Sequence, residues 1–281
     1  MSAYSQDLDT LEVAGLTLKG ITRGGIETCL MVQELRLMFD IGMCPPGFQK
    51  YRDILVSHGH SDHMGGIGYL VGQRRMTGAR PPRIHVPVEV VEPVHRLMAA
   101  WAEIEDHKPP YHLFGHAPGE SFEMGKSVTA TPLRTTHRVP SLGWVIERRT
   151  QRLLPEFAHL TGPEIGEKHK QGVTITQTHE EPLLCVTGDT QIEFFKANAI
   201  VRRCRVLVHE VTSYDDRSDV EKTRGWGHTH VDELAEVAEQ FEGEALVLVH
   251  RSARHSRRQA EKVVAEKFPA SMRGKVHVFG W

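Results

Sequence analysis

The chain has 281 residues, 40% of them hydrophobic and 25% charged, which excludes a disordered polymer and predicts a folded chain with a substantial core. A formal charge of −2 and a pI near 6.8 exclude a global basic field, so any polyanion must bind to a local patch. The four cysteines form no CxxC pair, which predicts a protein without disulfides in a reducing cytoplasm. The polar N-terminus predicts no signal peptide, and no apolar run approaches about 18 residues, so no membrane span is expected.

The first half of the chain alternates short apolar runs with turns and then with helical patterns. Strands are expected at residues 16–21, 28–34, 35–42, 53–58 and 83–87, helices at 64–78 and 88–102, and a loop at 105–120. Gly and Pro residues mark the intervening turns, so this half predicts a β-meander followed by strand–helix units.

The second half repeats this organisation after an irregular stretch. Strands are expected at residues 128–133, 142–147, 173–176, 183–187, 206–209, 245–249 and 276–279, helices at 192–197, 232–241 and 256–267, and irregular structure at 149–172. Two β-rich halves that each close with helices predict an α/β fold, a four-layer αββα sandwich formed by one domain over residues 1–281.

Four metal-binding side chains lie within six residues directly after the strand DILVS. They are His58, His60, Asp62 and His63, in the sequence HGHSDH. Imidazole nitrogen and carboxylate oxygen are zinc ligands, and a strand-to-helix turn can direct all four inward. So dense a set is improbable among ordinary surface histidines, so we interpret this turn as a metal site.

HxHxDH on such a turn resembles the signature of the metallo-β-lactamase superfamily. The resemblance implies the metallo-β-lactamase fold and three more ligands at later strand ends, which match His137, Asp189 and His250. It also implies two Zn²⁺ ions, with Mn²⁺ and Fe²⁺ as alternatives. His58, His60 and His137 would hold the first ion, Asp62, His63 and His250 the second, and Asp189 would bridge them.

The C-terminal third resembles ribonuclease Z, the endonuclease that trims the 3′ end of tRNA precursors. The similarity is carried by HEVT from His209, by HTH from His228, and by His250 after a strand. LTGPEIGEKHKQGVTI also resembles a Gly-Pro and Lys-x-Lys-x-Gly stretch of that family. The resemblance implies a phosphodiesterase in which Asp62 orients the attacking water and His228, positioned by Glu210, protonates the leaving oxygen. A structural ion pair is the alternative reading of Glu210 and His228.

Three features depart from typical ribonuclease Z. Met43-Cys44-Pro45-Pro46 replaces a Gly-Glu-Gly-Thr-Gln loop after Asp40-Ile-Gly42, and no Pro-x-Lys-x-Arg motif is evident. The segment between His137 and Asp189 is also expected to have too few residues for the long flexible arm that grips the tRNA elbow in typical members. The missing arm leaves open a small-molecule hydrolase for a cyclic phosphate, thioester or lactone. A non-enzymatic, zinc-stabilised RNA-binding or scaffold protein is a third possibility.

Basic residues near the motifs suggest where a phosphate could bind. Arg251 adjoins the last ligand and is the predicted substrate contact, whereas Arg257 and Arg258 fit a solvated helix face equally well. Arg148, Arg149 and Arg152 follow His137 and are expected near the mouth of the site. The expected partner is RNA or a small phosphodiester rather than a membrane, and a homodimer is an alternative to a monomer.

Overall fold

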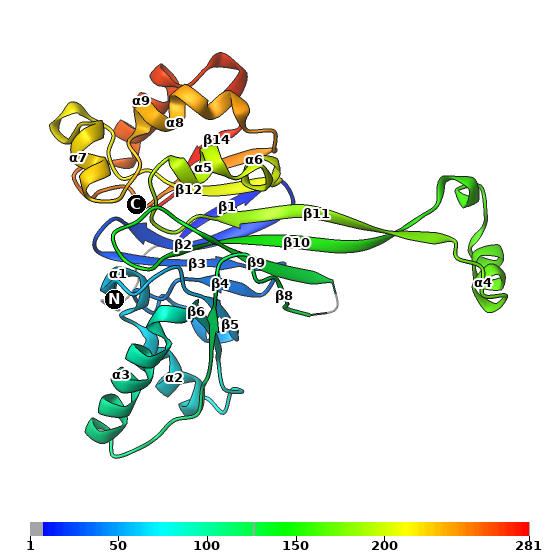
Figure 1. Cartoon of the computed structure of the whole chain (residues 1–281), viewed down its shortest axis with the longest axis horizontal. Coiled ribbons are helices and arrows are strands. Elements are labelled where there is room, and N and C mark those ends of the chain that lie inside the picture. The colour runs from blue at the N-terminus through cyan, green and yellow to red at the C-terminus, as the bar shows by residue number, and fades with distance from the viewer. Residues whose placement is uncertain (1–7, 126, 281) are drawn as a thin grey trace, which may run out of the picture.

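Two seven-stranded mixed sheets pack face to face in the computed structural model, which describes residues 8–125 and 127–280 (Figure 1). The first sheet has the order β1-β2-β3-β4-β5-β6-β7 and the second β14-β13-β12-β11-β10-β9-β8. The strands are β1 (Asp9–Val13), β2 (Leu16–Arg23), β3 (Glu27–Val32), β4 (Leu37–Phe39), β5 (Asp53–Leu55), β6 (Arg83–Pro87), β7 (His112–His116), β8 (Phe122–Glu123), β9 (Val128–Arg134), β10 (Leu142–Leu153), β11 (Thr176–Val186), β12 (Val206–Glu210), β13 (Ala245–Val249) and β14 (Val276–Val278).

Helices cover the outer face of each sheet (Figure 1). The α-helices of the described residues are α1 (Ser61–Met64), α2 (Ile67–Met76), α3 (Val91–Ile104), α4 (Gly162–Lys170), α5 (Glu193–Ala197), α6 (Ala199–Arg203), α7 (Val220–Gly225), α8 (Val231–Val237) and α9 (Arg257–Lys267). Helices α2 and α3 pack on the first sheet, while α5, α6, α8 and α9 pack on the second. The predicted four-layer αββα sandwich is confirmed.

One apolar layer joins the two sheets. Leu18 and Phe39 from the first sheet meet Trp144, Val208 and Val247 from the second, all fully or almost fully buried. Each such side chain contributes about 1.5–3 kcal/mol of transfer free energy when it leaves water. This shared layer fixes the two sheets against each other, and therefore fixes the strand ends that carry the candidate ligands.

The topology brings the ends of distant strands to one edge of the sandwich. Strands β11, β12 and β13 are parallel, and β9 runs the same way because both it and β11 pair antiparallel with β10. Asp189, His250 and His137 follow the carboxyl ends of β11, β13 and β9, and Glu210 is the last residue of β12. On the first sheet, β5 leads into His58, which forms an isolated bridge with Ser141.

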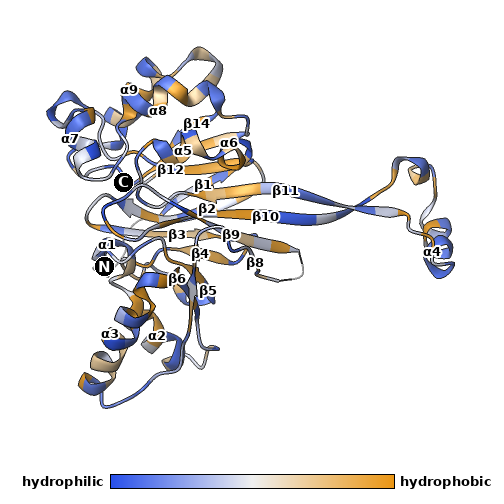
Figure 2. Ribbon diagram, viewed as in Figure 1, coloured by the Kyte–Doolittle hydropathy of each residue, from blue (hydrophilic) through white to orange (hydrophobic). Residues whose placement is uncertain are grey.

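A long two-stranded arm projects from the sandwich, and the prediction that the chain lacks one is wrong (Figure 1). Strands β10 and β11 pair from Trp144 opposite Val186 to Leu153 opposite Thr176, with a register shift between Ile146 and Glu147, and α4 lies at the far end. The outer part of the arm is mostly hydrophilic, as Figure 2 shows. Because a ribbon away from the core has no face to bury, RRTQRL and TQTHEE carry no apolar alternation that would predict strands.

Two smaller predictions also need correction. The predicted loop at 105–120 contains β7, an edge strand that pairs parallel with β6 and carries His112 and His116. Arg148, Arg149 and Arg152 lie along the arm, not at the mouth of the site. At about 3.3 Å per strand residue, Arg148 is roughly 23 Å along the chain from Ser141. No helix in the described part of the chain is long and apolar enough to cross a membrane.

Candidate metal centre

The HGHSDH segment leaves β5 and turns into the short helix α1, so its side chains are displayed at the sheet edge. His60 is the N-cap of α1 in an extended conformation, and Asp62 and His63 lie in the helix. The chain after β4 passes close beneath this turn, where Ile41 N donates to His63 O at 2.7 Å. A Cβ on Gly42 would lie 1.9 Å from Asp62 O, so only glycine fits there.

Three histidines form the first half of the cluster. His58 Nε2 lies 2.9 Å from His60 Nδ1, which in turn lies 3.4 Å from His137 Nε2. Ligand nitrogens about 2.0–2.1 Å from a tetrahedral zinc ion lie about 3.3–3.4 Å from one another. The three rings therefore present their nitrogens at close to the separation that one metal ion requires.

Asp62, His63 and His250 form the second half. The Nε2 atoms of His63 and His250 lie 3.2 Å apart, and Asp62 Oδ2 lies 3.6 and 3.5 Å from them. His250 has a positive φ of 61°, which is uncommon outside glycine. Its backbone N–H donates to Thr22 Oγ1 at 2.9 Å, which helps to hold that conformation.

Asp189 lies between the two halves with one oxygen toward each. Its Oδ2 is 3.6 Å from His58 Nε2 and 3.9 Å from His137 Nε2, while its Oδ1 is 3.3 Å from His63 Nε2 and 3.4 Å from His250 Nε2. Among the described residues this buried Oδ1 has no well-formed hydrogen bond. A buried carboxylate oxygen without a donor needs a cation, so the donor set fits divalent metal ions.

The charge states agree with that fit. Burial lowers the pKa of His58 well below its usual value, and the neighbouring His63 lowers it further, which favours the neutral form that binds metal. Burial also opposes a charge on His63, but Asp189 and Asp40 outweigh it and raise its pKa well above the usual value. A proton on His63 must therefore leave before Nε2 can bind a metal ion.

Glu210 and His228 lie directly beside this cluster. His228 Nδ1 is 2.9 Å from Glu210 Oε1 and 3.8 Å from Asp189 Oδ2. Glu210 Oε1 also accepts from the backbone N–H groups of Thr190 and Thr229 at 3.1 and 3.2 Å. Burial opposes a charge on His228, but the Glu210 carboxylate raises its pKa to about 9. The alternative interpretation placed Glu210 and His228 in a structural ion pair away from the metals. Their position beside Asp189 does not match it.

Known proteins with the same architecture support this geometry. Residues 42–176 match the model of the beta-lactamase superfamily domain. The chain is 34% identical to tRNase Z TRZ1 of Arabidopsis thaliana over 268 residues, which cover 95% of each protein. The chain belongs to the tRNase Z family. With the donor set described above, this tRNase Z family member is a metal-dependent hydrolase.

Other relatives of this tRNase Z family chain are more distant. Ribonuclease BN of Cronobacter sakazakii is 29% identical over 250 residues and 79% of each protein. The human short-form tRNase Z, ELAC1, superimposes with a TM-score of 0.53 at 17% identity, covering 99% of this chain and 93% of that one. YhfI of Bacillus subtilis, a metallo-beta-lactamase fold protein, gives 0.64 at 17% identity, covering 93% and 95%. At such identities the two structures show the shared fold.

Outer hydrogen bonds orient the histidines of this tRNase Z site, and sequence reasoning missed the residues that make them. Asp40 Oδ2 accepts from His63 Nδ1 at 2.8 Å and from Ser57 Oγ at 3.0 Å. Ser57 Oγ lies 2.9 Å from His58 Nδ1, so one carboxylate supports a ligand in each half. The only signal in the sequence was Asp40-Ile-Gly42, which we noted as a family motif without a role.

Two more groups complete this support. Gly227 O accepts from His137 Nδ1 at 2.8 Å, and Thr212 Oγ1 lies 3.0 Å from both His250 Nδ1 and Glu210 Oε2. With Nε2 facing a metal ion, each Nδ1–H must donate outward, and these partners accept it. The backbone carbonyl has no signal in the sequence, whereas Thr212 is the last residue of the HEVT motif, from which its contact with His250 did not follow.

The prediction that Arg251 contacts substrate is wrong. Its side chain is buried, and its guanidinium donates to His255 O and to Gly280 O at 3.0 Å. Because Arg251 is buried and hydrogen-bonded to two backbone carbonyls, it anchors the chain near Gly280 in the tRNase Z fold and is not available to a phosphate. His209 and His230 are also buried, the first bonded to Glu210 O and the second capping α8.

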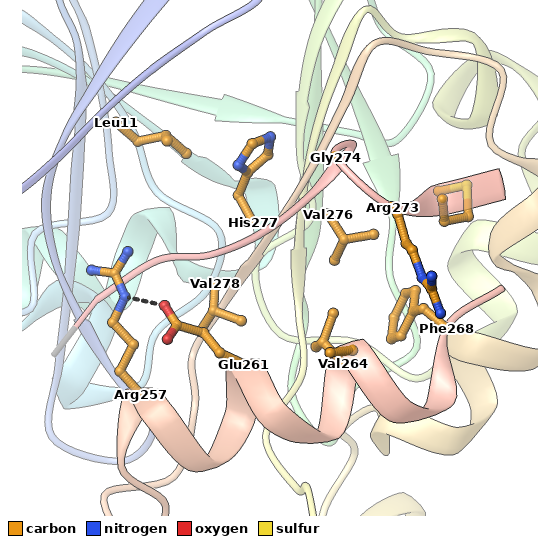
Figure 3. Close-up of a pocket in the computed structure, with 12 residues that line it drawn as sticks. Leu11, Arg257, Glu261, Val264, Phe268, Arg273, Gly274, Val276, His277 and Val278 are labelled. Carbon is orange, nitrogen blue, oxygen red and sulfur yellow. Dashed lines mark hydrogen bonds and ion pairs between the residues drawn. The ribbon is translucent and has the colours of Figure 1, made fainter. Parts of the chain in front are cut away.

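The C-terminal helix face has a structural role as well. Arg257 bonds to Asp9 Oδ2 at 2.8 Å and to Glu261 Oε1 at 3.0 Å. It lies at one end of a groove of about 310 Å³ between α9 and β14, lined by apolar residues such as Val264 and Phe268 (Figure 3). None of the lining residues belongs to the metal cluster, so this groove is separate from the tRNase Z site.

Proposed function

We propose that this chain is a zinc-dependent endoribonuclease that cleaves the phosphodiester bond at the 3′ end of tRNA precursors. The observation that carries the proposal is the Glu210–His228 pair beside the seven-residue cluster of His58, His60, Asp62, His63, His137, Asp189 and His250. A protonated histidine beside two metal ions could donate a proton to the alkoxide that leaves phosphorus when a phosphodiester bond is cleaved. The tRNase Z relatives named above carry tRNA in their names.

In the proposed reaction the chain's own residues bind, orient and protonate. The six candidate ligands other than Asp189 would divide three and three between two ions, and Asp189 would contribute to holding both. Divalent ions at this cluster supply Lewis acidity and an activated water at neutral pH. Asp62, whose side chain is 12% exposed, would orient the attacking water. Protonated His228, held through Nδ1 by Glu210, has Nε2 left to donate to the leaving oxygen.

The arm would bind the part of the tRNA that lies away from the cleavage site. It extends about 23 Å along β10 from Glu147 to Leu153 before the tip begins. Its far end carries Lys168 and Lys170 on α4, a helix without buried residues that also carries Glu164 and Glu167. Because the arm is distant from the cluster, its contacts would contribute to substrate binding and not to the chemical step.

The direct experiment combines metal analysis with three substrates. The purified protein is expected to contain two zinc ions per chain and to cleave a precursor tRNA with a 3′ trailer. It should also hydrolyse bis(p-nitrophenyl) phosphate slowly and leave a thioester intact. Turnover of the thioester without cleavage of the precursor would favour the small-molecule alternative, while metal without any hydrolysis would favour a binding protein.

We also propose a homodimer formed through the outer face of α2 and α3. Large apolar side chains are exposed there, with Met76 at 79%, Ile104 at 74%, Tyr69 at 56% and Trp101 at 40% exposure. A cavity of about 410 Å³ lies among them. Exposed apolar clusters of this kind mark interfaces. Light scattering after size-exclusion chromatography should give twice the chain mass, and Ile104→Glu should give the monomer mass.

A further inference from the structure

A tryptophan with two cations over its ring lies next to the candidate acid. Lys222 Nζ is 5.4 Å and Arg254 Cζ 5.6 Å from the centroid of the Trp226 ring. Both distances fall within the range of cation–π attraction. Trp226 itself is half-buried, while both basic side chains are exposed.

The backbone places this cluster at the rim of the metal centre. Trp226 is the C-cap of α7, and the next residue, Gly227, holds His137 through its carbonyl. A Cβ on Gly227 would lie 2.7 Å from His137 Nδ1, which shows how closely this loop passes the ligand. His228 follows directly, so Trp226 is two residues from the group that faces the leaving oxygen.

The second loop arrives from the other side of the cluster. Arg254 is four residues after His250, in a loop whose Ser252 N donates to Thr212 O at 3.1 Å. Thr212 in turn supports the His250 ring. The two loops that carry His228 and His250 therefore meet where Arg254 lies over Trp226.

The two cations are not neutralised within the described part of the chain. Neither Lys222 nor Arg254 has a carboxylate oxygen within 4.0 Å there, although Lys222 Nζ donates to Arg217 O at 3.4 Å and Arg254 Nε donates to Ser252 Oγ at 3.2 Å. Nearby acids are engaged elsewhere, since Asp215 pairs with Arg217 and Asp219 caps α7. Two free charges flanking an aromatic ring suit a phosphate with its adjoining base.

We propose that Lys222, Trp226 and Arg254 form a nucleotide-binding rim for the substrate RNA, beside the scissile phosphate. The cations contact the backbone of the strand, and the indole stacks on one unpaired base. This inference rests on the proposed function, because it assumes that RNA is the substrate. It assigns the rim a role in binding a single-stranded segment, distinct from the role of the arm.

The test compares Arg254→Gln, Trp226→Ala and Trp226→Phe with Arg258→Gln, a control on the exposed face of α9. KM and kcat are measured on precursor tRNA, and turnover is measured on bis(p-nitrophenyl) phosphate. Trp226→Ala should raise KM for the precursor by about 5- to 150-fold, the effect of losing one base stack. Trp226→Phe should recover most of the binding, and Arg258→Gln should match the wild type.

Salt dependence isolates the phosphate contact. For a 12-nucleotide single-stranded RNA, Arg254→Gln should reduce the slope of log affinity against log salt by about 0.7. Its effect on precursor tRNA should exceed its effect on the small phosphodiester by about tenfold or more. Equal losses on both substrates would show that the cluster only supports the His228 loop, and would overturn the inference.

The proposed function and the rim can fail separately. If the wild type cleaves no precursor tRNA, the proposed function fails, and binding of the 12-nucleotide RNA alone judges the rim. Unchanged affinity and unchanged salt slope in Arg254→Gln and Trp226→Ala would then overturn the rim. Metal content measured in every variant shows whether the histidine cluster remains intact.

Discussion

Glu210 Oε1 lies 2.9 Å from His228 Nδ1, while Glu210 Oε2 accepts from Thr212, whose hydroxyl supports His250. One buried carboxylate thus orients both the candidate acid and a candidate metal ligand. This relationship couples two parts of the site that lie 22 residues apart in sequence. Variants of His250 or of its support are therefore expected to lose metal, whereas variants of His228 are expected to lose only proton transfer.

Removing the candidate acid should slow chemistry without emptying the site. His228→Ala is expected to lower kcat on precursor tRNA by about 10²- to 10⁴-fold, the usual contribution of a positioned acid. Zinc content, measured by mass spectrometry, should stay at the wild-type level, because His228 lies outside the proposed ligand set. A variant that lost zinc would instead identify His228 as a ligand.

Removing the charge of Glu210 should shift the pH profile. Protonated His228 is the active form, so activity falls as pH rises through its pKa, which Glu210 raises to about 9. Bound divalent cations would lower that pKa in the loaded enzyme, so the informative quantity is the difference between variants. Glu210→Gln should move the alkaline limb of kcat/KM to lower pH, and an unmoved limb would argue against His228 as the acid.

Asp40 should act on metal affinity. Asp40→Asn removes the carboxylate that orients His63 and, through Ser57, His58. A loss of about 10- to 100-fold in zinc affinity is expected, as for other residues that orient metal ligands. Competition with a zinc chelator measures it. Asp216→Asn, at an exposed position, should bind zinc as the wild type does.

Two glycines two positions apart, Gly225 and Gly227, should respond in opposite ways to replacement by alanine. Gly227 has a φ of 86°, and a Cβ there would meet His137 Nδ1, so Gly227→Ala should lower both the melting temperature and zinc occupancy. Gly225 lies in α7 with nothing within 4 Å of an added Cβ, so Gly225→Ala should be neutral or stabilising by up to about 1 kcal/mol. Equal melting temperatures would contradict the close packing of Gly227.

Shortening the arm should separate binding from chemistry. Replacing residues 148–181 with a tight turn leaves the buried roots of β10 and β11, from Leu142 to Ile146 and from Leu183 to Val186, in the core. KM for precursor tRNA is expected to rise by more than tenfold, while turnover of bis(p-nitrophenyl) phosphate should persist. Unchanged cleavage of the precursor would show that the arm does not bind this substrate.

Much of the architecture followed from local pattern. Apolar runs such as those of β3, β12 and β13 are buried along their whole length, so hydrophobicity alone marked them as strands. The arm could not be predicted this way, because an exposed ribbon gains nothing from alternation. Strand β7 was missed for a similar reason, since it is an edge strand with little buried surface.

By itself the sequence determined the chemistry that was available: four ligand side chains in six residues, three more after apolar strands, and a Glu and a His within motifs that resemble those of ribonuclease Z. Those features are local, because ligand type and strand character depend on nearest neighbours. Only the tertiary structure decided which oxygen of Asp189 faces which half of the cluster, that Asp40 and Thr212 support the ligands, and that Arg251 is buried. These are contacts between residues far apart along the chain, and they exist only once two sheets pack and bring their strand ends to one edge.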